Sequence, residues 1–163
     1  MAKFIYRMQS ILDIKEKLEE QARNEFAAAR MHLNEEEEKL ALLKGRKASY
    51  EEQGRELQKS GLNVLDILTN RNAITRMQEF IEIQRDAVEA ANMQLEKARI
   101  KLRTAMQESK TQEKLRERAF EEFIREENAR EAKEVDELVS YTYSAASAGR
   151  SNKDGAEESY AIG

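Results

Sequence analysis

The stretch Ile74–Ala105, ITRMQEFIEIQRDAVEAANMQLEKARIKLRTA, decides the fold. Apolar side chains recur in it every seven residues, and a second, smaller set follows each of them by three. The first set is Ile74, Ile81, Val88, Leu95 and Leu102, and the second is Met77, Gln84, Ala91, Ala98 and Ala105. Five consecutive heptads of this kind are typical of a coiled-coil helix. The three alanines favour close approach of a second helix, although alanine is also simply the best helix former.

The residues before this stretch predict a second, antiparallel helix over about residues 4–59. Apolar side chains spaced by three, four and seven form one stripe there. They are Ile11, Leu18, Ala22, Phe26, Ala29, Leu33, Leu40, Leu43, Tyr50 and Leu57. Two successive steps of four, from Leu18 to Phe26, predict a stutter in the coiled coil. Gly61 and Asn63 suit a helix end and a helix start, which predicts a turn at residues 60–63.

A turn this short makes the two helices each other's nearest partners. Folding the chain about residue 62 places residue i near residue 124 − i. Leu33 then falls near Ala91, Phe26 near Ala98, and Phe4 near Phe120, while Leu40 falls near Gln84. Large side chains mostly face small ones, as an interdigitated seam requires.

The predicted fold is therefore all-α, a long antiparallel two-helix coiled-coil hairpin over residues 1–145. Helix 2, over about residues 64–143, is longer than helix 1. Residues 146–163 are small and polar and predict a disordered C-terminal tail.

The last part of helix 2, after about residue 120, has no predicted partner within the chain. It carries apolar side chains at Phe123, Ile124, Val135, Leu138 and Val139. An uncovered apolar stripe indicates a partner-binding surface, a dimer contact or disorder, and the sequence leaves all three open.

Composition excludes several classes of function. Charged residues make up 37% of the chain, with a net charge of −4 and no proline, cysteine or tryptophan. Residues 1–60 carry 12 basic and 12 acidic side chains, and residues 61–140 carry 14 and 17, so neither part has the basic excess of a nucleic-acid binder. No apolar run approaches the roughly 20 residues of a membrane span, and no secretory signal opens the chain. A cytoplasmic location is the default.

No residue pattern indicates catalysis, a cofactor or a metal site. His32 has no second histidine and no cysteine to share a metal with. The run from Glu35 to Glu38 points in four directions around a helix, which predicts a solvated face. Phosphate-binding loops and nucleophile motifs are absent.

The opening residues resemble a known family. Lys3-Phe4, followed by Met8-Gln9-Ser10-Ile11-Leu12-Asp13-Ile14-Lys15-Glu16-Lys17, is similar to the start of the FliJ proteins of the bacterial flagellum. The turn Lys59-Ser60-Gly61, the start of helix 2 with Met77 and Phe80, and the late stretch Glu134-Val135-Asp136-Glu137-Leu138 look similar too. The resemblance covers residues 3 to about 145.

The resemblance implies a component of the flagellar type III export apparatus, similar to the stalk subunit of rotary ATP synthases. The implied partners are the ring of the export ATPase FliI, the export gate FlhA and export chaperones. It implies a monomer in isolation, associated peripherally with the inner face of the cell membrane. The gate contact would fall on Leu43, Tyr50, Met77 and Phe80, whereas Arg46 and Ala73 stand where the family can have aromatic residues. Leu43, Tyr50 and Met77 also lie on the predicted seam, which leaves a role in the core alone open.

Two other functions are consistent with a coiled coil. One is a structural adaptor or scaffold unrelated to export, which would assemble through the stripe that contains Phe123 and Leu138. The other is a peripheral membrane helix, which the mixed or acidic faces of this chain disfavour because such helices carry a basic polar face. No nucleic-acid contact and no direct insertion into lipid are expected.

Overall fold

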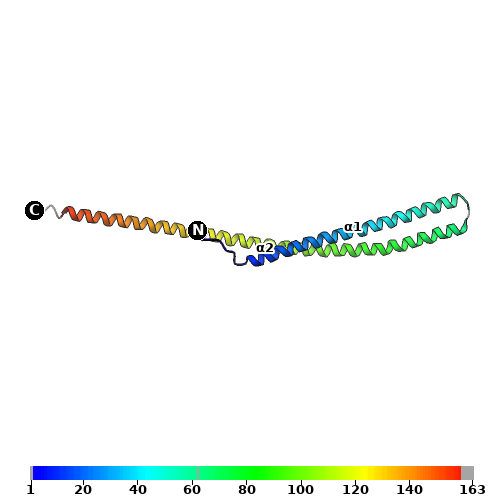
Figure 1. Cartoon of the computed structure of the whole chain (residues 1–163), viewed down its shortest axis with the longest axis horizontal. Coiled ribbons are helices and arrows are strands. Elements are labelled where there is room, and N and C mark those ends of the chain that lie inside the picture. Colours follow the sequence, from blue (N-terminus) through cyan, green and yellow to red (C-terminus); the bar gives the residue numbers. More distant parts are fainter. Residues whose placement is uncertain (1, 62, 159–163) are drawn as a thin grey trace. The chain divides into compact units, whose positions relative to one another are not determined.

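Two long helices make up the structure, a computed structural model that describes residues 2–61 and 63–158, with side chains described to residue 151. Helix α1 spans Gln9–Lys59 and helix α2 spans Val64–Glu158. Figure 1 shows the two helices running back along each other from the turn that joins them. The prediction of an all-α hairpin with a longer second helix is confirmed.

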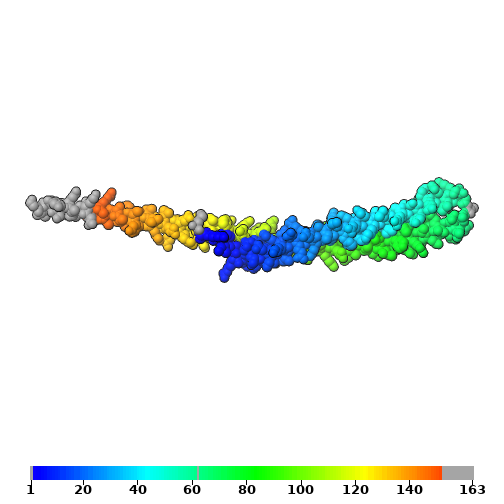
Figure 2. Space-filling view, in the orientation of Figure 1, coloured from blue at the N-terminus to red at the C-terminus, as the bar shows by residue number. Residues whose placement is uncertain are grey.

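The chain divides into two compact units. One is Ile11–Gln112, which contains the paired parts of α1 and α2 and the turn. The other is Met1–Ser10 together with Glu113–Gly163, in which the N-terminal segment packs on the later part of α2. In the space-filling view, the side chains of α1 and α2 are in contact along the paired unit (Figure 2).

The stripe that α1 buries is a regular heptad pattern without a stutter. Its positions are buried or half-buried at every step of three and four: Leu12, Lys15, Glu19, Ala22, Phe26, Ala29, Leu33, Glu36, Leu40, Leu43, Lys47, Tyr50, Gly54 and Leu57. The predicted seam residues Ile11 and Leu18 are instead 37% and 45% exposed. The stutter was wrong because the prediction followed apolar residues, while the real seam passes through polar ones.

The heptad pattern predicted for α2 is confirmed, since all ten of its positions are buried or half-buried. The core centres on Leu33 of α1 against Ala91 and Leu95 of α2. Ala91 is 1% exposed, and Phe26, Ala29 and Val88 pack around this cluster. A large side chain thus meets a small one across the seam, as the pairing rule predicted.

Contacts between the helices confirm the predicted register to about one helical turn. Lys15 Nζ lies 2.8 Å from Glu108 Oε2, and Lys101 Nζ lies 2.7 Å from Glu25 Oε2. These residue numbers add to nearly the predicted total of 124. The exposed ion pairs contribute little to stability individually, so they report the register more than they create it.

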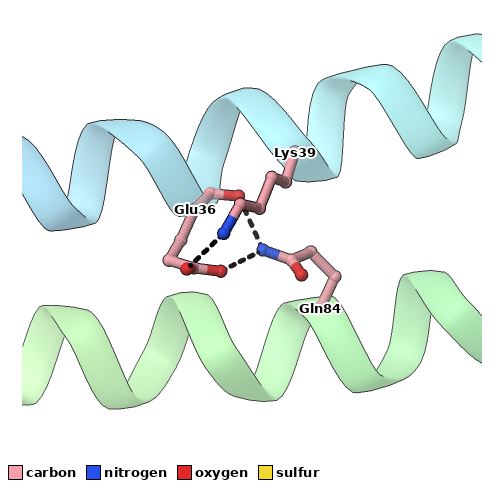
Figure 3. Close-up of polar contacts among 3 residues, drawn as sticks. All are labelled: Glu36, Lys39 and Gln84. Carbon is pink, nitrogen blue, oxygen red and sulfur yellow. Dashed lines mark hydrogen bonds and ion pairs between the residues drawn. The ribbon is translucent and has the colours of Figure 1, made fainter.

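A polar layer interrupts the apolar seam at Glu36. This residue is only 8% exposed, which corrects the prediction that Glu35 to Glu38 form a solvated face. The Gln84 amide donates to the Glu36 backbone oxygen at 2.9 Å and also to its carboxylate. Lys39 Nζ donates to the same carboxylate at 3.0 Å (Figure 3). A buried carboxylate needs such donors, because an unpaired one is costly to remove from water.

The turn joins α1, which ends at Lys59, to α2, which begins at Val64. Gly61 has φ +116°, a left-handed conformation that side chains other than glycine rarely adopt. Asn63 caps α2, since its Oδ1 accepts a hydrogen bond from the Leu65 backbone N–H at 3.3 Å. Leu62 lies outside the described residues.

Both outer helix ends differ from the predicted bounds. Helix α1 begins at Gln9 rather than near residue 4, and no acidic residue stands in its first turn. Helix α2 continues beyond residue 143 to Glu158. Alanines 145, 146 and 148 are strong helix formers, which favours this continuation. Of the predicted disordered tail, residues 146–158 are helical, and residues 159–163 lie outside the described residues.

The packing at Ala91 gives a first prediction. Ala91→Leu should lower the free energy of unfolding by about 1–3 kcal/mol, because the seam has no room for a larger side chain opposite Leu33. Urea unfolding followed by circular dichroism measures the change. Ala90→Leu is the matched control, since Ala90 is exposed, and it should stay within about 0.5 kcal/mol of the wild type. Equal effects at the two positions would contradict the close packing.

The polar layer gives a second prediction, on pH. The Gln84 amide, with Lys39 beside it, holds the pKa of Glu36 below its ordinary value of 4.5. Hydrogen bonds from Arg23 and Lys101 likewise lower the pKa values of Glu19 and Glu25. The unfolded chain therefore binds more protons in this range, and stability should be lost as the pH falls from 4.5 through the lowered pKa values.

The variant Glu36→Gln isolates the contribution of this layer. The new amide oxygen can still accept from Gln84 but has no charge to lose. The urea midpoint of the variant should therefore fall less between neutral and acidic pH than that of the wild type. An identical pH dependence of the two proteins would show that Glu36 does not contribute.

Candidate partner-binding surfaces

An aromatic cluster fixes the N-terminal segment on α2. The Phe4 ring packs against Phe120 with centroids 5.2 Å apart and against Phe123 with centroids 5.3 Å apart. The Arg116 guanidinium lies over the Phe4 ring, 6.0 Å from its centroid, and Arg116 Nε donates to Gln9 Oε1 at 3.1 Å. Aromatic and cation–π contacts of this kind add to the apolar area that is buried. The predicted approach of Phe4 to Phe120 is confirmed.

Because of this cluster, the uncovered part of α2 begins later in the sequence than predicted. Phe123 was predicted to have no partner within the chain, and that is wrong because the Phe4 ring covers it. Further along α2, Glu127 is 7% exposed and forms an ion pair with Arg130 at 3.1 Å. Every described side chain from residue 128 to residue 151 is exposed. The stretch of α2 over residues 128–151, which we call the overhang, is therefore the uncovered part.

The overhang displays an apolar stripe. Val135, Leu138 and Val139 are 56%, 66% and 61% exposed, and Ile124 stands just before the overhang at 38%. Steps of three and four place Val135, Leu138 and Val139 on one face of the helix. Sequence reasoning missed Tyr141 and Tyr143, which are more exposed still. They follow Leu138 by three residues and Val139 by four, and that spacing could have identified them as neighbours of the stripe.

Negative charge surrounds this stripe. Residues 121–143 carry eight acidic and three basic side chains. The stripe thus combines exposed aliphatic side chains with an acidic background. A protein groove with an apolar floor and basic edges would complement both features.

A groove near the turn collects three of the four residues predicted for the gate contact. Tyr50 of α1 lines it together with Met77 and Phe80 of α2, and its volume is about 610 Å³. Tyr50 and Met77 are half-buried, and Phe80 is 48% exposed. The remaining lining residues are Thr69, Asn72, Ala73, Thr75, Arg76 and Glu79. Leu43, the fourth predicted residue, is half-buried in the seam and does not line this groove.

Two further apolar surfaces were not predicted. One is a shallow groove along α1, lined by Glu38, Ala41, Leu42, Gly45, Arg46 and Ser49. Gly45 leaves it open, since a Cβ there would meet nothing within 4 Å. The other is a face formed by Ile11, Ile14 and Leu18, where the true seam leaves three apolar side chains outside.

The described part of the chain contains no group of three or more His, Asp or Glu side chains placed to hold a metal ion. None of its helices is both long enough and apolar enough to cross a membrane. The acidic run at Glu35 to Glu38 is divided between the buried layer at Glu36 and exposed side chains at Glu35, Glu37 and Glu38.

Comparison with known proteins gives two matches. The family described as flagellar FliJ protein matches residues 4–148. The fold is similar to a solved structure described as a putative YscO homolog from Chlamydia trachomatis, with a TM-score of 0.69 and 22% sequence identity. That match covers 89% of this chain and 98% of the other. No curated protein matches the chain.

Proposed function

This chain belongs to the FliJ family, a non-catalytic component of the flagellar type III export apparatus, and on that premise we propose that it acts as a stalk for the export ATPase. In this proposal the overhang enters the FliI ring, and the groove near the turn contacts the gate protein FlhA. Export chaperones are further partners. The chain then works at the inner face of the cell membrane, held there by the export apparatus.

The observation that carries the stalk proposal is the overhang itself. A single helix that exposes Val135, Leu138 and Val139 keeps apolar area in water unless a partner covers it. A ring can surround one helix on all sides, whereas a flat partner covers one face only. Exposure on every side of residues 128–151 therefore suits insertion into a ring.

The stripe gives a third prediction. The double variant Leu138→Glu/Val139→Glu should weaken stimulation of the FliI ATPase by roughly tenfold or more, because it places charge in an apolar contact. Ser140→Glu is the matched control: it adds a charge at the next position on the same exposed helix but removes no apolar side chain of the stripe, so it should weaken stimulation far less. Steady-state ATP hydrolysis at varied concentrations of the chain measures both.

Circular dichroism of the same variants must show unchanged helix content, since the overhang packs on no other described segment. If the double variant stimulates the ATPase as the wild type does, the stripe is not the ring contact. End-to-end assembly through the stripe, seen by sedimentation at varied concentration, would instead favour the structural adaptor. A monomer is expected.

The proposed gate contact is supported by the groove near the turn. Residues of both helices line it, and the exposed side chain of Phe80 is one of them. Large aromatic side chains in such concave sites commonly contribute most of the binding energy. Tyr50 and Met77 supply apolar surface beside it, and Arg76 and Glu79 supply charges for orientation.

A fourth prediction follows for the gate. Phe80→Ala should weaken binding to the cytoplasmic domain of FlhA by roughly tenfold, as removal of an aromatic anchor usually does. Titration calorimetry measures the affinity. Met93→Ala is the control, because Met93 is 60% exposed on the same helix but does not line the groove. Equal affinities of the two variants would place the gate contact elsewhere.

A further inference from the structure

Two side-chain amides of α2 reach across the seam to the main chain of α1. Asn70 Nδ2 donates to the Tyr50 backbone oxygen at 2.9 Å, and Gln84 Nε2 donates to the Glu36 backbone oxygen at 2.9 Å. Fourteen residues separate the two donors, and fourteen separate the two acceptors. The contacts therefore recur after two heptads on both helices. We call Asn70 and Gln84 the seam amides.

The apolar seam alone does not fix how far one helix lies along the other. Its second set of positions is alanine three times in succession, at Ala91, Ala98 and Ala105. A shift of one heptad would replace Ala91 by Ala98 opposite Leu33, and large would still face small. Sequences with a strict heptad repeat are open to such slips unless a polar residue opposes them.

The site of Asn70 faces Gly54 of α1. A Cβ on Gly54 would lie 2.5 Å from Asn70 Oδ1, so a larger residue there would make the Asn70 amide shift. A slip of one heptad in one direction would bring Lys47, which has a Cβ, to this place. A slip in the other direction would bring Gly61 there, so Asn70 opposes slips in the first direction.

The site of Gln84 opposes slips in both directions because Glu36 is buried. Its carboxylate takes one cross-helix donor, the Gln84 amide, as Figure 3 shows. After a slip of one heptad, Glu36 would face Met77 or Ala91, and neither side chain can donate a hydrogen bond. Lys39 would remain, since it lies on the same helix. Losing the cross-helix donor of a buried charge carries a large penalty.

We propose that the seam amides Asn70 and Gln84 lock the axial register of the hairpin between its turn and the polar layer at Glu36. When two antiparallel helices joined by a short turn slip by one heptad relative to each other, one helix becomes longer at the turn by about half a heptad. The other helix becomes shorter by the same amount, so the turn forms at a different place in the sequence. The lock opposes this migration. The lock also keeps Tyr50 of α1 beside Met77 and Phe80 of α2 in the groove, because a one-heptad slip would displace the two helices relative to each other by roughly 10 Å.

Pulsed electron paramagnetic resonance on the full chain tests the lock. The chain has no cysteine, so spin labels can be placed by Ala48→Cys on α1 and Met93→Cys on α2, both at exposed positions. With the seam amides intact, one narrow distance is expected. With Asn70→Leu/Gln84→Leu added, we expect a second distance shifted by roughly 10 Å, one heptad. Leucine suits these positions, so the hairpin should remain helical.

One comparison decides the result. Met77→Leu, which changes the seam layer between the two amides, should keep the single wild-type distance. A single wild-type distance in the double leucine variant, with circular dichroism showing an intact hairpin, would overturn the proposal.

Discussion

The structure depends on one constraint: each helix has a single apolar stripe, and the other helix is the partner that covers it. Neither α1 nor α2 can bury that stripe alone, so the pair forms as a unit and the short turn sets its direction. The burial is modest, because only a few side chains, such as Leu12, Ala22 and Leu95, are almost fully covered. Small differences in seam chemistry can therefore decide the register.

The polar residues of the seam provide these differences in chemistry. They also explain which parts of the fold could be predicted from the sequence and which could not. The heptads of α2, the turn at Gly61 and the pairing of Leu33 with Ala91 were predictable, because apolar periodicity and glycine conformation determine them. The seam of α1 was not, since it passes through Lys15, Glu19 and Glu36. A lone helix pattern cannot tell a buried carboxylate from a solvated one. That depends on whether the facing position, here Gln84, offers a donor.

The candidate surfaces were predictable to a similar degree. Tyr50, Met77 and Phe80 could be expected near one another from the register, and they line one groove. The covering of Phe123 by Phe4 could not be foreseen in this form, because it requires the chain before Gln9 to leave the helix and pack as a separate segment. Tyr141 and Tyr143 were not predicted as part of the stripe, although their spacing from Leu138 and Val139 places them beside it.

The two candidate surfaces make different demands on the fold. The stripe of the overhang lies on one helix, so its geometry follows from the α-helix itself and needs no partner segment. The groove takes Tyr50 from α1 and Phe80 from α2, so it exists only at one register. Asn70 lines a cavity beside that groove together with Tyr50 and Ala73, and it is also a seam amide. Polar residues in the seam reduce the apolar area that the two helices bury. We attribute their presence to the need to hold the two helices at the one register at which this groove exists.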